Sequence, residues 1–294
     1  MPALSRRFAL LVNPAAGGGR SLRALPAVTA ELDRLGAAHR TVTTRNMEHA
    51  AEEAARAGEA GETVAAVGGD GLLRPIAGAL KGTDAAVALI PSGRGNDLAR
   101  VLGVPRDPAR AARLAVEGGE RRLDVASVDG TPYLGIASFG FDSDANRIAN
   151  EAKLVKGDAV YLYAALRALA AWKPATFEVT VDGTRHVVTG YSIAVGNSRS
   201  YGGGMLLLPH AELDDGKLDV LLAKDASKLT VLRELPKVFK GKHLDSPHVE
   251  VLRGEVIEVT SDRPFVIYAD GDPIGATPAT MRVERQALRL IGPS

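Results

Sequence analysis

Residues 64–80 read VAAVGGDGLLRPIAGAL, an apolar run that ends in three glycines placed around one aspartate. The run has the length and the β-branched content of a buried strand, and the residues after it resemble a helix in composition. Glycines remove side chains where the backbone comes close to another group. A phosphate is one candidate, because a helix N-terminus offers free N–H groups and a positive dipole end. A tight strand-to-helix turn without a ligand is equally compatible with this stretch alone.

Short β-rich runs alternate with helical stretches through residues 1–124. The runs are RFALLV, HRTVTT, TVAAVG and AAVALI, and the apolar pattern of helical spacing after the first run ends at Gly36. This alternation predicts a doubly wound α/β domain, in which helices cover both faces of a parallel sheet. Ligands of such sheets bind at the carboxyl ends of the strands. The three unusual loops of this sequence follow predicted strands, at residues 13–20, 68–71 and 91–97.

The second half of the chain has a different sequence pattern, in which β-rich runs replace the alternation of strands and helices. β-rich runs surround Asp-Gly pairs at residues 129, 182 and 270, and such pairs are a strong signal for β-hairpins. We therefore expect a mostly antiparallel β domain with a few inserted helices over residues 125–294. The last run, ALRLIG, is also able to pack back on the first domain.

Composition limits the function classes. A chain of 294 residues favours two domains, and its 36 Lys plus Arg against 35 Asp plus Glu give no support for a nucleic-acid partner. The absence of cysteine excludes disulfides and thiolate metal sites and fits a reducing, cytoplasmic compartment. No stretch reaches the roughly 18 apolar residues of a membrane span, so any membrane contact is expected to be peripheral. The sequence does not indicate the oligomeric state.

The three loops share glycine together with Asn, Arg or Asp. In the doubly wound interpretation they meet at one edge of the sheet, where residues 17–19 and Arg20 contact phosphates while Asp70 and Asp97 face a cation. Three such turns at successive strand ends favour a phosphate site over three unrelated structural turns.

Several segments, in this order and at these intervals, resemble the bacterial diacylglycerol kinase family of lipid kinases, which includes sphingosine and ceramide kinases. The segments are LVNPAAGGGR, TTRNMEHA, VGGDG, PSGRGNDLAR, VGNSRSYGGGMLLLPHAELDDGKLDV and YADGDP. The resemblance runs from about residue 8 to the end. It implies an ATP- and magnesium-dependent kinase that phosphorylates a lipid hydroxyl, with diacylglycerol favoured, in a cleft between an α/β nucleotide domain and a β-sandwich domain.

The resemblance also implies the site residues. Thr44 stands where the family has a nucleotide-contacting threonine, and Arg94 stands where it usually has another. The positions implied to bind the nucleotide are Asn13, Pro14, Ala15, Ala16, Gly17, Arg20, Thr44, Gly68, Gly69, Asp70, Gly71, Leu72, Arg74, Arg94, Asn96 and Asp97. Asp70, with Asp97 and Asp124, is implied to form the acidic, magnesium-linked part of the cleft.

The family's structural magnesium site corresponds to Glu212, Asp215 and Lys217. Asp215 matches the carboxylate ligand, and the other two match positions that lend backbone carbonyls, which suits the preference of magnesium for oxygen. Without the resemblance, DDGK is typical of a turn before a strand.

The catalytic base is implied at the turn formed by residues 270–272. The family has Asp-Gly-Glu there, and one of the acids takes the proton from the substrate hydroxyl. Asp272 replaces the glutamate with a side chain one methylene shorter. We expect Asp272 to be the base and Asp270 to support it or share the task. Turn chemistry alone does not distinguish Asp270 from Asp129 or Asp182.

The sequence departs from the family after GGDG. The family continues with Thr or Ser and, two places later, Asn-Glu, whereas this chain has Leu72, Arg74 and Pro75. A hydroxyl and an amide are missing, and Arg94 would supply positive charge near the phosphates instead. A catalytically weak or inactive regulatory protein that binds nucleotide or lipid is therefore the alternative function. A relative of NAD kinase is disfavoured by the segments that begin at residues 201 and 270.

Residues 228–244, KLTVLRELPKVFKGKHL, combine leucines with five basic side chains. The pattern fits a helix that docks on an anionic membrane. It also fits a domain helix whose leucines pack inward and whose basic face is solvated, and Pro236 favours this second interpretation.

Overall fold

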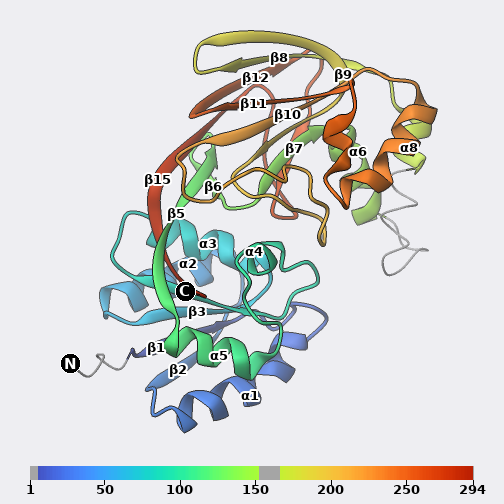
Figure 1. Cartoon of the computed structure of the whole chain (residues 1–294). Coiled ribbons are helices and arrows are strands. Elements are labelled where there is room, and N and C mark those ends of the chain that lie inside the picture. Colours follow the sequence, from blue (N-terminus) through green and yellow to red (C-terminus); the bar gives the residue numbers. More distant parts are fainter. Residues whose placement is uncertain (1–5, 152–165, 294) are drawn as a thin grey trace.

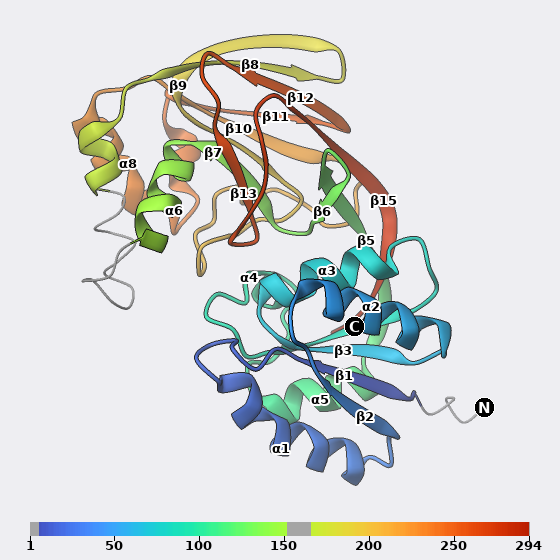
Figure 2. The same cartoon turned by 180° about the vertical axis from the view of Figure 1, so that it is seen from behind.

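The computed structural model describes residues 6–151 and 166–293. Figures 1 and 2 show a β-rich half lying on an α/β half, with two long strands running between them. Within the described residues, no helix is both long enough and apolar enough to cross a membrane.

The α/β half alternates strands and helices. Its elements are β1 (Phe8–Val12), α1 (Arg20–Arg34), β2 (His39–Thr43), α2 (Met47–Glu59), β3 (Thr63–Gly68), α3 (Asp70–Leu80), β4 (Ala86–Pro91), α4 (Asp97–Val101) and α5 (Pro108–Glu117). The strands are parallel in the order β2-β1-β3-β4. Helices α1 and α5 cover one face, and α2 and α3 cover the other (Figure 2). The doubly wound prediction is confirmed.

The β-rich half is mostly antiparallel, as predicted. Its elements are β5 (Gly119–Val128), β6 (Thr131–Tyr133), β7 (Ile136–Gly140), α6 (Phe141–Glu151), β8 (Ala175–Val181), β9 (Thr184–Gly196), β10 (Leu218–Lys224), α8 (Lys228–Val238), the 3-10 helix η1 (Lys242–Asp245), β11 (Val249–Gly254), β12 (Val256–Ser261), β13 (Val266–Ala269), β14 (Asp272–Ala276) and β15 (Ala279–Gly292). The strand order is β14-β13-β7-β9-β8-β12-β15-β5-β6, and β10 pairs with β9 and β11. A short helical segment at residues 166–171 precedes β8.

The Asp-Gly pairs that begin at residues 129, 182 and 270 each turn a hairpin. The φ angles of Asp129, Asp182 and Asp270 are 47°, 46° and 52°, and each following glycine also has a positive φ. Two consecutive residues with positive φ give the turn twist that two-residue hairpin loops need, which is why Asp-Gly is favoured there. The pairs connect β5 to β6, β8 to β9 and β13 to β14.

Strands β5 and β15 join the two halves. They pair antiparallel from Met281 to Gly292 with a bulge between Glu284 and Leu288, and the end of β15 also pairs parallel with β4. The boundary predicted after Asp124 falls inside β5. Each half nevertheless has its own apolar core, built on the parallel sheet in one half and on clustered aromatic rings in the other.

Candidate active site

Three glycine-containing loops meet at the carboxyl ends of β1, β3 and β4. A Cβ atom on Gly17 would lie 2.4 Å from the carbonyl oxygen of Ser92, so the first loop packs on the third. A Cβ atom on Gly93 would lie 2.5 Å from the Cα of Gly69, so the second and third loops touch backbone to backbone. Residues without side chains are required for this approach. The structure thus brings together the three loops that the sequence singled out.

The junction of these loops carries polar groups. Asn96, at φ 52°, accepts a hydrogen bond from the N–H of Gly93 at 2.8 Å and donates one to its carbonyl at 3.0 Å. The buried hydroxyl of Ser92 has no hydrogen-bond partner among the described residues. Because an unpaired buried hydroxyl is costly, the junction fits a ligand that brings oxygen atoms to it, as a phosphate does.

Asp70 begins α3 and holds the start of α4. Its carboxylate accepts hydrogen bonds from the backbone N–H groups of Asp97 at 3.0 Å and Leu98 at 3.2 Å. Burial raises the pKa of Asp70, and the charge of Asp97 raises it further. Two neighbouring carboxylates that repel each other fit a divalent cation, which would relieve the repulsion.

Asp97 also contacts the β-rich half. Its Oδ2 accepts a hydrogen bond from the N–H of Gly203 at 2.8 Å, and its Oδ1 lies 3.5 Å from the hydroxyl of Ser200. Sequence reasoning did not assign these two residues a role. The run of three glycines at residues 202–204 was the available signal, since it repeats the composition of the other loops.

Asp272 lies over the GGDG loop from the opposite half. Its Oδ2 is 3.2 Å from Nη2 of Arg74, and a Cβ atom on Gly71 would lie 3.5 Å from the same oxygen. The side chain of Arg74 is 12% exposed and that of Asp272 is 33% exposed. Two positions at which the sequence departs from the family that it resembles therefore contact each other between the two halves.

Asp270 is held by the connection between β6 and β7. Its two carboxylate oxygens accept hydrogen bonds from the backbone N–H groups of Leu134 and Gly135, both at 3.0 Å. Burial raises the pKa of Asp270 to about 7, with a contribution from the charge of Asp70. These contacts fix the turn that carries Asp272 and leave both carboxylate oxygens of Asp270 engaged with backbone donors.

The other residues predicted to bind the nucleotide differ in their burial and in their hydrogen bonds. Leu72 is buried against Gly68 in the core, so its side chain does not face the junction. The hydroxyl of Thr44 donates to the carbonyl of Val12 at 3.2 Å. The first loop, with Asn13, Pro14, Ala15 and Ala16, is closed by the hydrogen bond from the N–H of Ala15 to Oδ1 of Asn13. Arg20 and Arg94 are exposed, and Arg20 donates to the carbonyl of Gly17 at 3.1 Å.

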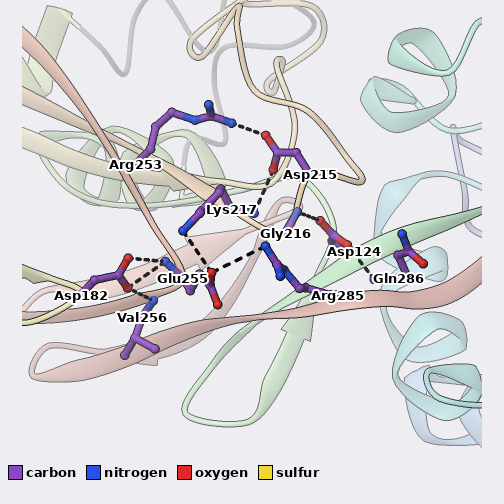
Figure 3. Close-up of polar contacts among 10 residues, drawn as sticks. All are labelled: Asp124, Asp182, Asp215, Gly216, Lys217, Arg253, Glu255, Val256, Arg285 and Gln286. Carbon is purple, nitrogen blue, oxygen red and sulfur yellow. Dashed lines mark hydrogen bonds and ion pairs between the residues drawn. The ribbon is translucent and has the colours of Figure 1, made fainter.

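Two of the three predicted structural metal residues, Asp215 and Lys217, lie in a separate polar cluster (Figure 3). Asp215 accepts a hydrogen bond from the N–H of Lys217 at 2.8 Å and forms an ion pair with Arg253, while Glu212 is exposed. Both carboxylate oxygens of Asp215 are thus engaged, and a magnesium ion would have to compete with the guanidinium. Among the described residues, no group of three or more acidic or histidine side chains is placed to hold a metal.

Asp124 lies beside this cluster and not with Asp70 and Asp97. It is fully buried, and its carboxylate accepts hydrogen bonds from the N–H groups of Gly216 at 2.6 Å and Gln286 at 2.7 Å (Figure 3). Both carboxylate oxygens of Asp124 thus accept hydrogen bonds from backbone N–H groups of two other segments. The structure therefore gives Asp124 a role in joining β5, β15 and the loop before β10.

The sequence matches known proteins over nearly its whole length. Residues 7–128 match the diacylglycerol kinase catalytic domain, and residues 135–292 match the YegS C-terminal NAD kinase beta sandwich-like domain. A diacylglycerol kinase of Mycobacterium tuberculosis is 33% identical, with 96% of this chain and 94% of the relative covered. The chain belongs to the diacylglycerol kinase family of lipid kinases. The resemblance noted in the sequence is confirmed.

A further relative and a solved structure also match this chain over nearly its whole length. A protein of Pseudomonas aeruginosa named "Probable lipid kinase YegS-like" is 32% identical, with 96% of this lipid kinase chain and 92% of the relative covered. A crystal structure described as a diacylglycerol kinase of Bacillus anthracis has a TM-score of 0.76 at 20% identity, with 98% and 97% of the two chains covered. The structural likeness shows the same fold, an α/β domain followed by a β-sandwich.

Proposed function

We propose that this lipid kinase transfers the γ-phosphate of ATP, in the presence of magnesium, to the hydroxyl of a lipid alcohol resembling diacylglycerol. The proposal is supported most strongly by one observation, the meeting of Asp272 with the GGDG loop across the two halves. A carboxylate opposite a glycine-lined phosphate cradle is what phosphoryl transfer to a hydroxyl needs.

The residues divide the work between them. The loops around Gly17, Gly69 and Gly93 would hold the nucleotide phosphates through backbone N–H groups. Magnesium, bound near Asp70 and Asp97, would neutralise charge on those phosphates.

Asp272 would accept the proton of the lipid hydroxyl while the oxygen of that hydroxyl forms a bond to the γ-phosphorus of ATP. The bond from this phosphorus to the bridging oxygen would break at the same time, which releases ADP. Arg74 would hold the short Asp272 side chain in place. Because little covalent help is needed, positioning by the two halves supplies most of the catalysis.

Transfer of radiolabelled phosphate from ATP to a panel of lipid alcohols tests this function. We expect labelled product from a diacylglycerol, a requirement for magnesium, and loss of product with Asp272→Asn while ATP binding is retained. ATP binding without transfer to any lipid would instead support the regulatory alternative. The contact of Arg74 with Asp272 favours that alternative too, since it engages the proposed base.

A further inference from the structure

Helix α8 presents an apolar and basic face to solvent. No residue of this helix is buried, and the exposed fractions of Leu229, Leu232 and Phe239, the residue after its end, are 57%, 39% and 57%. The sequence favoured leucines that pack inward, and for Leu229 and Leu232 this expectation is wrong. The side that does face the domain is formed by the half-buried residues Val231, Leu235 and Val238.

The exposed side chains form one continuous stripe on the helix. At 100° per residue, Leu229, Leu232 and Phe239 fall within the same third of the helix circumference, and Arg233 flanks them on one side. Lys240 follows in the turn after the helix end. We call these five residues the α8 outer face. Helices with this division of apolar and basic side chains lie in the interface of a bilayer, with the apolar side chains inserted and the basic ones at the headgroups.

The charge of this region is unlike that of the rest of the chain. Residues 228–242 contain five basic side chains and one acidic one, whereas the formal net charge of the whole chain is +1. Glu234 is paired with Lys237 at 2.9 Å, and in the described part of the chain neither Arg233 nor Lys240 has a carboxylate partner. Positive charge that the fold does not neutralise is complementary to anionic lipid headgroups.

The position of α8 fits a role in approaching a lipid. Figures 1 and 2 show α8 next to α6 at the outer end of the β-rich half, on the same side of the molecule as α4. Helix α4 begins at Asp97, which contacts the β-rich half at the candidate site. A bilayer against this side would therefore lie on the side of the molecule where α4 and the candidate site are found.

We infer that the α8 outer face docks this protein on an anionic lipid bilayer. The inference rests on the proposed function, because a lipid substrate is what brings such an enzyme to a membrane. The apolar stripe anchors the helix and the basic side chains select acidic headgroups, so binding requires both and weakens as salt is raised.

Co-sedimentation of the full chain with vesicles tests this inference. The vesicles are phosphatidylcholine alone or phosphatidylcholine with 30% phosphatidylglycerol. We expect binding to the anionic vesicles only, and at least a tenfold lower partition coefficient for Leu232→Asn/Phe239→Asn and for Arg233→Gln/Lys240→Gln. The matched control is Leu22→Asn/Arg110→Gln, which removes an exposed leucine and an exposed arginine from the α/β half and is expected to bind like the unmodified chain.

Kinase assays separate docking from chemistry. The outer-face variants are expected to lose activity toward diacylglycerol in vesicles but to keep it toward a water-soluble, short-chain diacylglycerol. Wild-type affinity of both variants for anionic vesicles overturns the inference. So does a dimer that these substitutions convert to monomers, because the face then belongs to a second copy. If no lipid is phosphorylated but vesicle binding still depends on this face, the proposed function fails and the docking surface stands.

Discussion

Replacement of Arg74 by methionine tests the role of the contact that this residue makes with Asp272 between the two halves. Arg74→Met keeps a long apolar stem in the space of the side chain and removes the guanidinium that pairs with Asp272 at 3.2 Å. The substitution also removes Nε, a buried nitrogen that has no hydrogen-bond partner in the described part of the protein. We therefore expect the fold to tolerate the change and the orientation of Asp272 to be lost.

The size of the effect follows from the environment of the pair. Two unit charges about 4 Å apart attract by about 4 kcal/mol at an effective dielectric constant of about 20. Asp272 is one-third exposed, so solvent screening lowers this to about 1.5–3 kcal/mol. If this attraction is what holds the base, kcat falls roughly 10- to 100-fold in Arg74→Met while the KM for ATP stays within a factor of about 2.

The double variant distinguishes positioning from direct phosphate contact. Asp272→Asn removes the base and is expected to lower kcat by about 10²- to 10⁴-fold. If Arg74 acts through Asp272, adding Arg74→Met to Asp272→Asn costs nothing more, because the group being positioned is already gone. Steady-state transfer from ATP to diacylglycerol in mixed micelles measures all three variants under one condition.

Two results would refute this reasoning. Multiplicative losses in the double variant would show that Arg74 acts independently of Asp272, for instance on a phosphate. A rise in kcat for Arg74→Met would show that the ion pair restrains the acid and opposes its reaction. Arg74→Lys is the matched control, since it keeps the charge without the planar fork and is expected to retain an intermediate rate.

Three further outcomes are expected. Gly93→Ala places a Cβ atom 2.5 Å from a backbone atom of Gly69, so the melting temperature is expected to fall by several degrees and ATP affinity, measured by calorimetry, at least tenfold. Asp124→Ala leaves the buried backbone N–H of Gly216 and the part-buried N–H of Gln286 without their acceptor, and urea unfolding is expected to show a loss of about 2 kcal/mol or more, whereas an unchanged value would exclude a structural tie. Burial raises the pKa of Asp142 to about 6, so the folded state binds the extra proton and stability falls as pH rises from about 4 to about 7. In Asp142→Asn, the loss of unfolding free energy between these two pH values is expected to be smaller by about 1.5–3 kcal/mol, as measured by urea unfolding at each pH. An unchanged pH dependence would contradict the raised pKa of Asp142.

The local parts of the fold were predictable because their signals are local. Buried strands appeared as short apolar runs, and the three Asp-Gly pairs fixed their hairpins through positive φ angles that these residues tolerate. Leu72 shows a signal that was available but not used. Leu72, Leu73, Ile76, Ala77 and Leu80 are the buried residues of α3, and this helical periodicity already places Leu72 on the core face.

The long-range contacts were not predictable from spacing. Arg74 and Asp272 are 198 residues apart, and no local pattern indicates that two positions so distant will pair. The role of Asp124 was not predictable from the sequence either. An aspartate in a predicted cleft is as compatible with a metal as with a buried acceptor of backbone N–H groups, and only the fold shows that Gly216 and Gln286 donate to it.

Asp124 also explains how the two halves keep a common geometry. The chain crosses between them on β5 and β15, and β15 bulges between Glu284 and Leu288 at that crossing. Gln286 has a φ of 48° in the bulge, and its N–H is held by the Asp124 carboxylate. A bulge left without this acceptor could change the angle between the strands. Because Arg74 and Asp272 come from opposite halves, any such change alters their separation directly, so a substitution at Asp124 is expected to reduce activity as well as stability.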